Sequence, residues 1–182
     1  MQPVIALLGP PGCGKGTQAE RLKDELGFAG LATGDLLREA RAAGTELGRR
    51  AGEYMDRGEL VPDDLIADVI EHALAELGGR SVLLDGFPRN VAQAEALDRA
   101  LGRALTGVVL IDVPDDVVVE RIGGRHQGRA DDNPETVRER LRVYHRETEP
   151  LVAHYDERGL LRRVDGAQDP DAVHDGIRAA LG

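Results

Sequence analysis

Residues 9–17 read Gly-Pro-Pro-Gly-Cys-Gly-Lys-Gly-Thr and follow directly on an apolar run, Val4 to Leu8. A helical pattern from Thr17 to Leu26 comes next, and Gly27 is a plausible stop. Glycines let backbone N–H groups turn toward one anion, and Lys15 adds a fixed positive charge. Strand, loop and helix together predict a loop that binds the phosphates of a nucleotide.

This loop departs in one place from the common ending Gly-Lys-Ser/Thr, because Gly16 separates Lys15 from Thr17. Only Lys15 and Lys23 are lysines among 23 lysine and arginine residues, and one of them fills the cationic position. A chance glycine-rich turn is the alternative, and the flanking pattern disfavours it. The single cysteine, Cys13, cannot form an internal disulfide. We expect it to be a small packed side chain, with a redox role as the less favoured alternative.

Size and charge narrow the class of protein. A chain of 182 residues supports one α/β core with small inserts. The net charge of −10 disfavours a nucleic-acid partner, because phosphate backbones are bound mainly by surplus Lys and Arg. No apolar run is long enough to span a membrane, and the chain opens on a strand rather than a leader, so we expect a cytoplasmic protein. The five histidines show no metal-ligand spacing, so no zinc site is predicted.

Short apolar runs alternate with helical patterns along the chain, and this alternation predicts a parallel sheet with helices on both faces. The expected strands are Val4 to Leu8, Phe28 to Leu31, Val82 to Leu84, Val108 to Ile111 and Leu160 to Val164. One long helix is expected from about Glu135 to Glu157. Residues 32–61 and 124–134 break the alternation and are interpreted as inserts, the second as a short lid. In such sheets the active site lies at the carboxyl ends of the strands.

Four further signatures accompany the loop. They are Thr-Gly-Asp-Leu-Leu-Arg at 33–38, Gly-Glu-Leu-Val-Pro-Asp at 58–63, Asp-Gly-Phe-Pro-Arg at 85–89 with Gln93 beyond it, and the arginines around the second insert. With these in the same order and spacing, essentially the whole chain resembles the adenylate kinases and the wider nucleoside monophosphate kinase family. The resemblance implies a three-layer P-loop fold with a core of 1–31, 62–123 and 135–182, an acceptor-binding insert of 32–61 and a short lid of 124–134.

For the donor nucleotide, the resemblance implies that Lys15 and the loop hold the phosphates of ATP. The expected ATP-binding residues are Pro11, Gly12, Cys13, Gly14, Lys15, Gly16, Thr17, Arg121, Arg125 and Gln168. Thr17 and Asp85 are expected in the shell of a bound Mg²⁺, Asp85 through water. Phosphoryl transfer needs alignment, charge neutralisation and exclusion of water rather than a general base. The expected catalytic residues are Lys15, Arg89, Arg129 and Arg140.

For the acceptor, the resemblance implies an AMP site. Its expected residues are Thr33, Arg38, Glu59, Leu60, Val61, Gly86, Phe87, Pro88, Arg89, Gln93, Arg129 and Arg140. Thr33 and Gln93 favour AMP over pyrimidine monophosphates, since the Gln93 amide can pair with an adenine edge. The expected reaction is ATP + AMP = 2 ADP, catalysed by a monomer. The alternatives are a UMP/CMP kinase, which shares most of these motifs, and a nucleotide-dependent switch.

Overall fold

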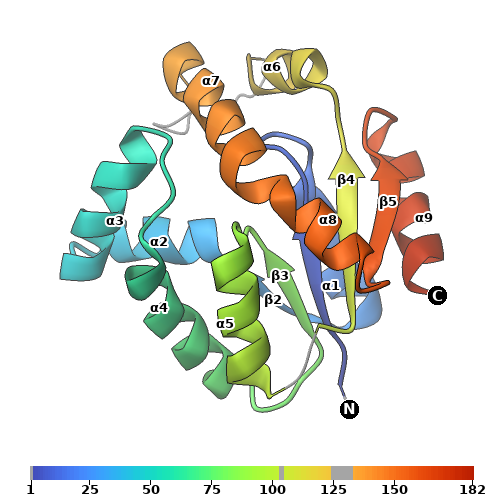
Figure 1. The fold of residues 1–182 in the computed structure, drawn as a ribbon, viewed down its shortest axis with the longest axis horizontal. Coiled ribbons are helices and arrows are strands. Elements are labelled where there is room, and N and C mark those ends of the chain that lie inside the picture. Colours follow the sequence, from blue (N-terminus) through green and yellow to red (C-terminus); the bar gives the residue numbers. More distant parts are fainter. Residues whose placement is uncertain (1, 103–104, 124–132) are drawn as a thin grey trace.

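The computed structural model describes residues 2–102, 105–123 and 133–182. For residues 67, 68 and 71 it describes the backbone alone. Strands and helices alternate along most of this chain (Figure 1). The elements are β1 (Val4–Leu8), α1 (Lys15–Leu26), β2 (Ala29–Ala32), α2 (Thr33–Ala42), α3 (Glu46–Asp56), α4 (Asp63–Glu76), β3 (Val82–Asp85), α5 (Val91–Leu101), β4 (Gly107–Asp112), α6 (Asp115–Gly123), α7 (Pro134–Val143), the π-helical turn η1 (Tyr144–Thr148), α8 (Pro150–Asp156), β5 (Leu161–Asp165) and α9 (Pro170–Leu181).

The five strands form one sheet in the order β2-β3-β1-β4-β5, and every neighbouring pair is parallel. All five predicted strands are therefore confirmed, with bounds that differ by at most one residue at either end. Because the strands run in one direction, their carboxyl ends meet at the upper edge of the sheet in Figure 1. At this edge Asp85 of β3 lies between Leu7 of β1 on one side and Ala32 of β2 on the other.

Successive residues of β1 point to opposite faces of the sheet, and each face has its own apolar core. Val4, Ala6 and Leu8 pack with buried residues of α4, α5 and α8. Ile5 and Leu7 pack with buried residues of α1, α6, α7 and α9. All five residues of β1 are buried, as expected for the central strand of a parallel sheet covered on both faces. The predicted three-layer arrangement is confirmed.

The long helix predicted from about Glu135 to Glu157 is confirmed in its extent, but it is not α-helical throughout. It is divided into α7, η1 and α8, which together cross the sheet diagonally in Figure 1. Pro150 gives the physical reason, because it has no N–H to donate and its ring clashes with the carbonyl four residues earlier. The backbone widens just before it, where the Glu149 N–H donates to the Tyr144 carbonyl, five residues back, at 2.8 Å.

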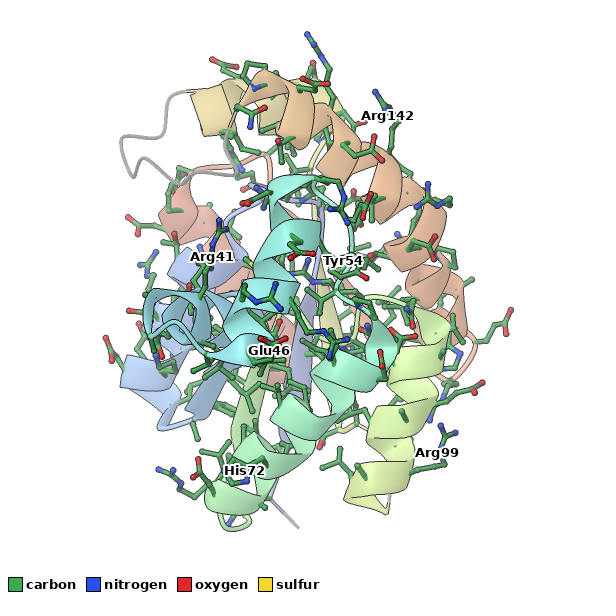
Figure 2. All side chains as sticks on the ribbon, turned by 90° about the vertical axis from the view of Figure 1, so that its left-hand side faces the viewer. Arg41, Glu46, Tyr54, His72, Arg99 and Arg142 are labelled. Atoms are coloured by element: carbon green, nitrogen blue, oxygen red, sulfur yellow. The ribbon has the colours of Figure 1, made fainter. Side chains whose placement is uncertain are left out.

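The first predicted insert contains α2 and α3, which pack closely against each other and contribute no strand to the sheet. Figure 2 looks onto this insert and shows Arg41 of α2 with Glu46 and Tyr54 of α3. The second predicted insert, the lid of 124–134, falls outside the described residues except for Asn133 and Pro134, and so do Arg125 and Arg129. Within the described residues, none of the helices has the length and apolar character required to cross a membrane.

Candidate active site

The phosphate loop leaves β1 after Leu8 and enters α1 at Lys15. Gly12 has φ +80°, and a Cβ atom there would lie 2.6 Å from Ile122 Cγ1, so this position requires glycine. No side chain caps the start of α1, and no acidic residue stands in its first turn. The first N–H groups of the helix are therefore not capped by a side chain, and with the helix dipole they favour an anion.

Lys15 folds back over this loop. Its Nζ donates to the carbonyl oxygens of Gly9 at 2.7 Å and Pro10 at 2.9 Å, and it lies 3.4 Å from Cys13 Sγ. The positive charge is thus held beside the N-terminus of α1. Cys13 itself is only 3% exposed and packs in the apolar core with Ile5 and Leu7, which agrees with the expectation of a small packed side chain.

Two oxygen-bearing side chains lie next to this loop and line the same cavity. Asp85 is the last residue of β3, paired in register with Leu7 of β1, and Thr17 lies in the first turn of α1. A Cβ built on Gly16 would lie 3.6 Å from Asp85 Oδ2, so the carboxylate lies directly against the start of the helix. Carboxylate and hydroxyl oxygens are donors that suit Mg²⁺, so this pair fits the predicted metal shell.

Arg89 belongs to the loop between β3 and α5, and its backbone is fixed by side chains from two directions. Its N–H donates to Gln93 Oε1 at 2.7 Å, and its carbonyl accepts from Thr148 Oγ1 at 2.7 Å. Its Nε donates to the Gly86 carbonyl at 2.8 Å, and the buried Thr33 hydroxyl donates to the same carbonyl at 3.0 Å. The Gly86 carbonyl thereby links the predicted base-reading threonine to the predicted phosphate-binding arginine.

Gln93 is 4% exposed and makes two side-chain contacts within the protein. Besides accepting from Arg89, its Nε2 donates to Asp63 Oδ1 at 2.6 Å. Asp63 also accepts from Asn90 Nδ2 at 3.1 Å, and Asn90 caps α5 by accepting from the Gln93 N–H at 2.8 Å. In the sequence, Asp63 was the last residue of the signature at 58–63, and no individual role in the site was predicted for it. Acidic residues are common in the first turn of a helix, so the position of Asp63 at the start of α4 did not indicate that it would contact Gln93.

Two adjoining cavities lie at this edge of the sheet. The larger, about 430 Å³, lies along the phosphate loop and is bounded also by Thr17, Asp85 and Tyr144. Burial raises the pKa of the Tyr144 phenol, so this side chain stays neutral. The smaller cavity lies between the insert and the loop after β3. It is lined by Thr33, Gly34, Leu37, Arg38, Met55, Gly58, Glu59, Leu60, Val61, Ile66, Gly86, Phe87, Arg89, Gln93 and Arg140.

The two cavities share three arginines, Arg38, Arg89 and Arg140, which come from three separate stretches of the chain. Arg38 pairs with Asp35, which lines the larger cavity. Every described residue of the predicted acceptor set lines one cavity or the other, Pro88 lining the larger. The apolar walls of the smaller cavity, formed by Leu37, Met55 and Ile66, were not predicted, because apolar helix positions look alike whether they face a core or a cavity.

Arg121 and Gln168 meet away from these cavities. The Arg121 guanidinium donates to the carbonyl oxygens of Gly166 at 2.7 Å and of Ala167 and Gln168 at 3.2 Å each. Asp165 accepts from the Ala167 N–H, a bond that lowers the pKa of its carboxyl group. Arg121 and Gln168, both predicted to bind ATP, are thus joined, with Arg121 holding the backbone of the 166–168 loop. Of the predicted ATP set, Cys13, Arg121 and Gln168 do not line either cavity.

The helices of the insert are held together by charge as well as by close packing. Arg41 of α2 donates to both carboxylate oxygens of Asp56 at the end of α3, at 2.7 and 2.9 Å. This contact lowers the pKa of Asp56. From α7, the Thr136 hydroxyl reaches the Asp56 carbonyl at 3.3 Å. The insert thereby contacts the helix that follows the predicted lid.

Comparison with known proteins adds independent information. The family described as adenylate kinase matches residues 7–160. An adenylate kinase of Thermus thermophilus is 57% identical over 183 residues, covering 98% of this chain and 96% of that protein. Adenylate kinases of Stenotrophomonas maltophilia and Xanthomonas euvesicatoria are each 50% identical, the first covering 97% of this chain and the second 98%, and 98% of each relative. These comparisons do not favour the UMP/CMP kinase alternative. Since the match extends over nearly the whole sequence, the chain belongs to the adenylate kinase family.

Proposed function

We propose how this chain performs the adenylate kinase reaction: ATP lies along the phosphate loop in the larger cavity, AMP occupies the smaller one, and the γ-phosphoryl group passes between them. The observation that carries this proposal is that Arg38, Arg89 and Arg140 line both cavities. Transfer between two nucleotides requires their phosphates to meet at one aligned, positively charged point. The three arginines shared by the two cavities supply the positive charge at the place where the phosphates would meet.

On the donor side, the N–H groups at the start of α1 and the Lys15 ammonium would hold the β- and γ-phosphates. Lys15 donates to two loop carbonyls, and phosphate oxygens are stronger acceptors that would take over these hydrogen bonds. Thr17 and Asp85 would hold Mg²⁺, which when bound neutralises part of the charge on the donor phosphates. Arg121 would act on the ATP base side through the loop that contains Gln168.

On the acceptor side, Thr33 and Gln93 would read the base. The Thr33 hydroxyl hydrogen is engaged by the Gly86 carbonyl, so its oxygen lone pairs are available as acceptors for the exocyclic amine of adenine. Gln93 uses one N–H on Asp63 and one lone pair on Arg89, which leaves one donor and one acceptor. Adenine offers the matching acceptor and donor on its Watson–Crick edge.

Charge neutralisation would be the main chemical contribution of the protein, because the acceptor phosphate is already ionised and needs no general base. Arg38 and Arg89 would hold the acceptor phosphate, and Arg140 the transferring group. Arg125 and Arg129 would add positive charge from the lid side and help to exclude water. We further propose that the protein acts as a monomer, since one chain supplies both cavities. For its location we propose the cytoplasm, as expected from the sequence.

Replacement of Arg89 by alanine tests the proposal. We expect Arg89→Ala to lower kcat by roughly 10³-fold or more, as for an arginine that stabilises phosphoryl transfer. Arg142→Ala is the matched control, because Arg142 has a side chain that is 70% exposed and pairs with Glu139; it points away from the molecule in Figure 2. A near-normal rate for Arg89→Ala, or an equal loss in both variants, would remove Arg89 from the proposed mechanism.

A further inference from the structure

We propose that Asp63 is a specificity-determining positioning residue: it fixes the orientation of the Gln93 amide and so selects adenine over bases with the opposite hydrogen-bonding edge. The inference rests on the proposed role of Gln93 as base reader. Asp63 stands at the first residue of α4, thirty positions before Gln93, and its Oδ1 accepts from Gln93 Nε2 at 2.6 Å.

An amide has two nearly isosteric orientations, which exchange its donor and its acceptor. Two contacts distinguish these orientations at Gln93. Asp63 offers only acceptor oxygens when ionised, and the Arg89 backbone group that contacts the amide is an N–H donor at 2.7 Å, while the Arg89 carbonyl accepts from Thr148. In the reversed orientation the amide oxygen would face the carboxylate, and the NH₂ group would face the Arg89 N–H. Both contacts would then be repulsive, so the amide is held in one orientation.

This orientation has a consequence for the choice of base. Adenine and cytosine present a donor amine beside an acceptor nitrogen on their pairing edges, whereas guanine and uracil present an acceptor carbonyl beside a donor N–H. A freely rotating glutamine could match either arrangement. A glutamine fixed by Asp63 and Arg89 matches only one of them, and a good bidentate pair discriminates between bases strongly. Selection against guanine and uracil would therefore depend on Asp63 even though it lines neither cavity.

Asp63 also holds a second amide, because it accepts from Asn90 Nδ2 at 3.1 Å, and Asn90 caps the helix on which Gln93 lies. Asp63 is exposed at the surface, so water can replace part of these contacts when the carboxylate is removed. Removal should consequently change selectivity more than it changes folding. This separates Asp63 from a purely structural residue.

The test compares kcat/KM for AMP and GMP, with ATP and Mg²⁺, in Asp63→Ala, Asp63→Asn and Asp64→Ala. Asp64 is the matched control, since it is exposed and belongs to the same acidic first turn of α4. We expect Asp63→Ala to lower the AMP-to-GMP ratio by about tenfold, the scale of one lost bidentate pair. Asp63→Asn keeps an acceptor oxygen and should restore most of the ratio, and Asp64→Ala should leave it unchanged.

A second background separates this inference from the role of Gln93. Gln93→Leu alone should lower the preference for AMP; if it does not, Gln93 does not read the base. If it does, Asp63→Ala added to Gln93→Leu should cause no further loss, because Asp63 acts through that amide. Additive losses in the double variant, or equal ratios for Asp63→Ala and Asp64→Ala, would overturn the inference. Melting temperatures measured on each variant show that the comparison concerns folded protein.

Discussion

Gly48 is the position where the structure makes the sharpest demand on a single residue of the insert. A Cβ atom there would lie 2.2 Å from the carbonyl carbon of Ala40 and from the backbone nitrogen of Arg41. These are backbone atoms of α2 and cannot rotate away. Because carbon atoms reach comfortable contact near about 3.5 Å, Gly48→Ala must separate the helices by roughly 1 Å. We expect the substitution to weaken both the insert and the acceptor site.

The magnitude follows from two opposing terms. Overpacking costs about 1–3 kcal/mol, and contact with rigid backbone places Gly48→Ala at about 3 kcal/mol. Alanine in a helix gains about 1 kcal/mol over glycine, which leaves a net loss of about 2 kcal/mol. For a chain of this size that corresponds to a fall in Tm of roughly 4–8 °C. The KM for AMP should rise several-fold with the KM for ATP unchanged, since Met55 of α3 and Leu60 just beyond that helix line the smaller cavity.

Gly52→Ala is the matched control, one helical turn further along α3. Its Cβ would lie 3.0 Å from Cδ and Nε of the Arg41 side chain, which can move. The assay is thermal unfolding together with initial rates at varied AMP and varied ATP. Gly52→Ala should be as stable as the parent protein or slightly more so. Equal Tm and equal KM for AMP in the two variants would refute the close approach of α2 and α3.

Three further predictions address the base, a metal and pH. Thr33→Val should leave kcat with AMP nearly intact while lowering selectivity for AMP over CMP by about tenfold, the scale of one hydrogen bond; unchanged selectivity would assign base choice elsewhere. A zinc-selective chelator should leave the rate unchanged in excess Mg²⁺, because the only cysteine, Cys13, lies in the phosphate loop; loss that zinc alone restores would contradict this. His145→Gln should reduce stability at low pH only. Asp115 first and Glu149 second raise the pKa of His145, so its stabilisation is full below about pH 6.5 and is lost as pH rises through the raised pKa. Urea unfolding at several pH values checks this, and a stability difference independent of pH would disprove it.

Much of the fold was predictable because the signals were local. Five short apolar runs became five strands of a buried parallel sheet, since each run is too short for a helix and lies beside a turn. Gly27 ends α1 in a left-handed conformation, as expected of a C-terminal glycine. The strand order β2-β3-β1-β4-β5 was not predicted, because it depends on contacts between distant segments. The π-helical turn η1 within the predicted long helix was not foreseen, because helical periodicity continues across Pro150.

Residues of the candidate site could be proposed from the sequence where one motif supplied them, and not where two distant segments had to meet. Short motifs pointed to the phosphate loop, Thr33, Arg38 and Arg89. In the structure these residues lie around two adjoining cavities. The contacts of Gln93 with Asp63 and of Arg121 with the 166–168 carbonyls join residues at least thirty positions apart. Nothing in the local composition of either partner indicated them. Long-range hydrogen bonds of this kind require the structure.

The most direct test of the central claim is an acceptor comparison. ADP formation from ATP and Mg²⁺ is measured with AMP, CMP, UMP and GMP offered separately. The two-cavity account predicts that AMP is preferred over GMP and UMP by about 100-fold or more in kcat/KM, because adenine matches the buried polar groups of the site and those two bases leave them unpaired. Preference for CMP or UMP would contradict the roles given to Thr33 and Gln93, and no transfer to any acceptor would contradict the two-nucleotide mechanism as a whole.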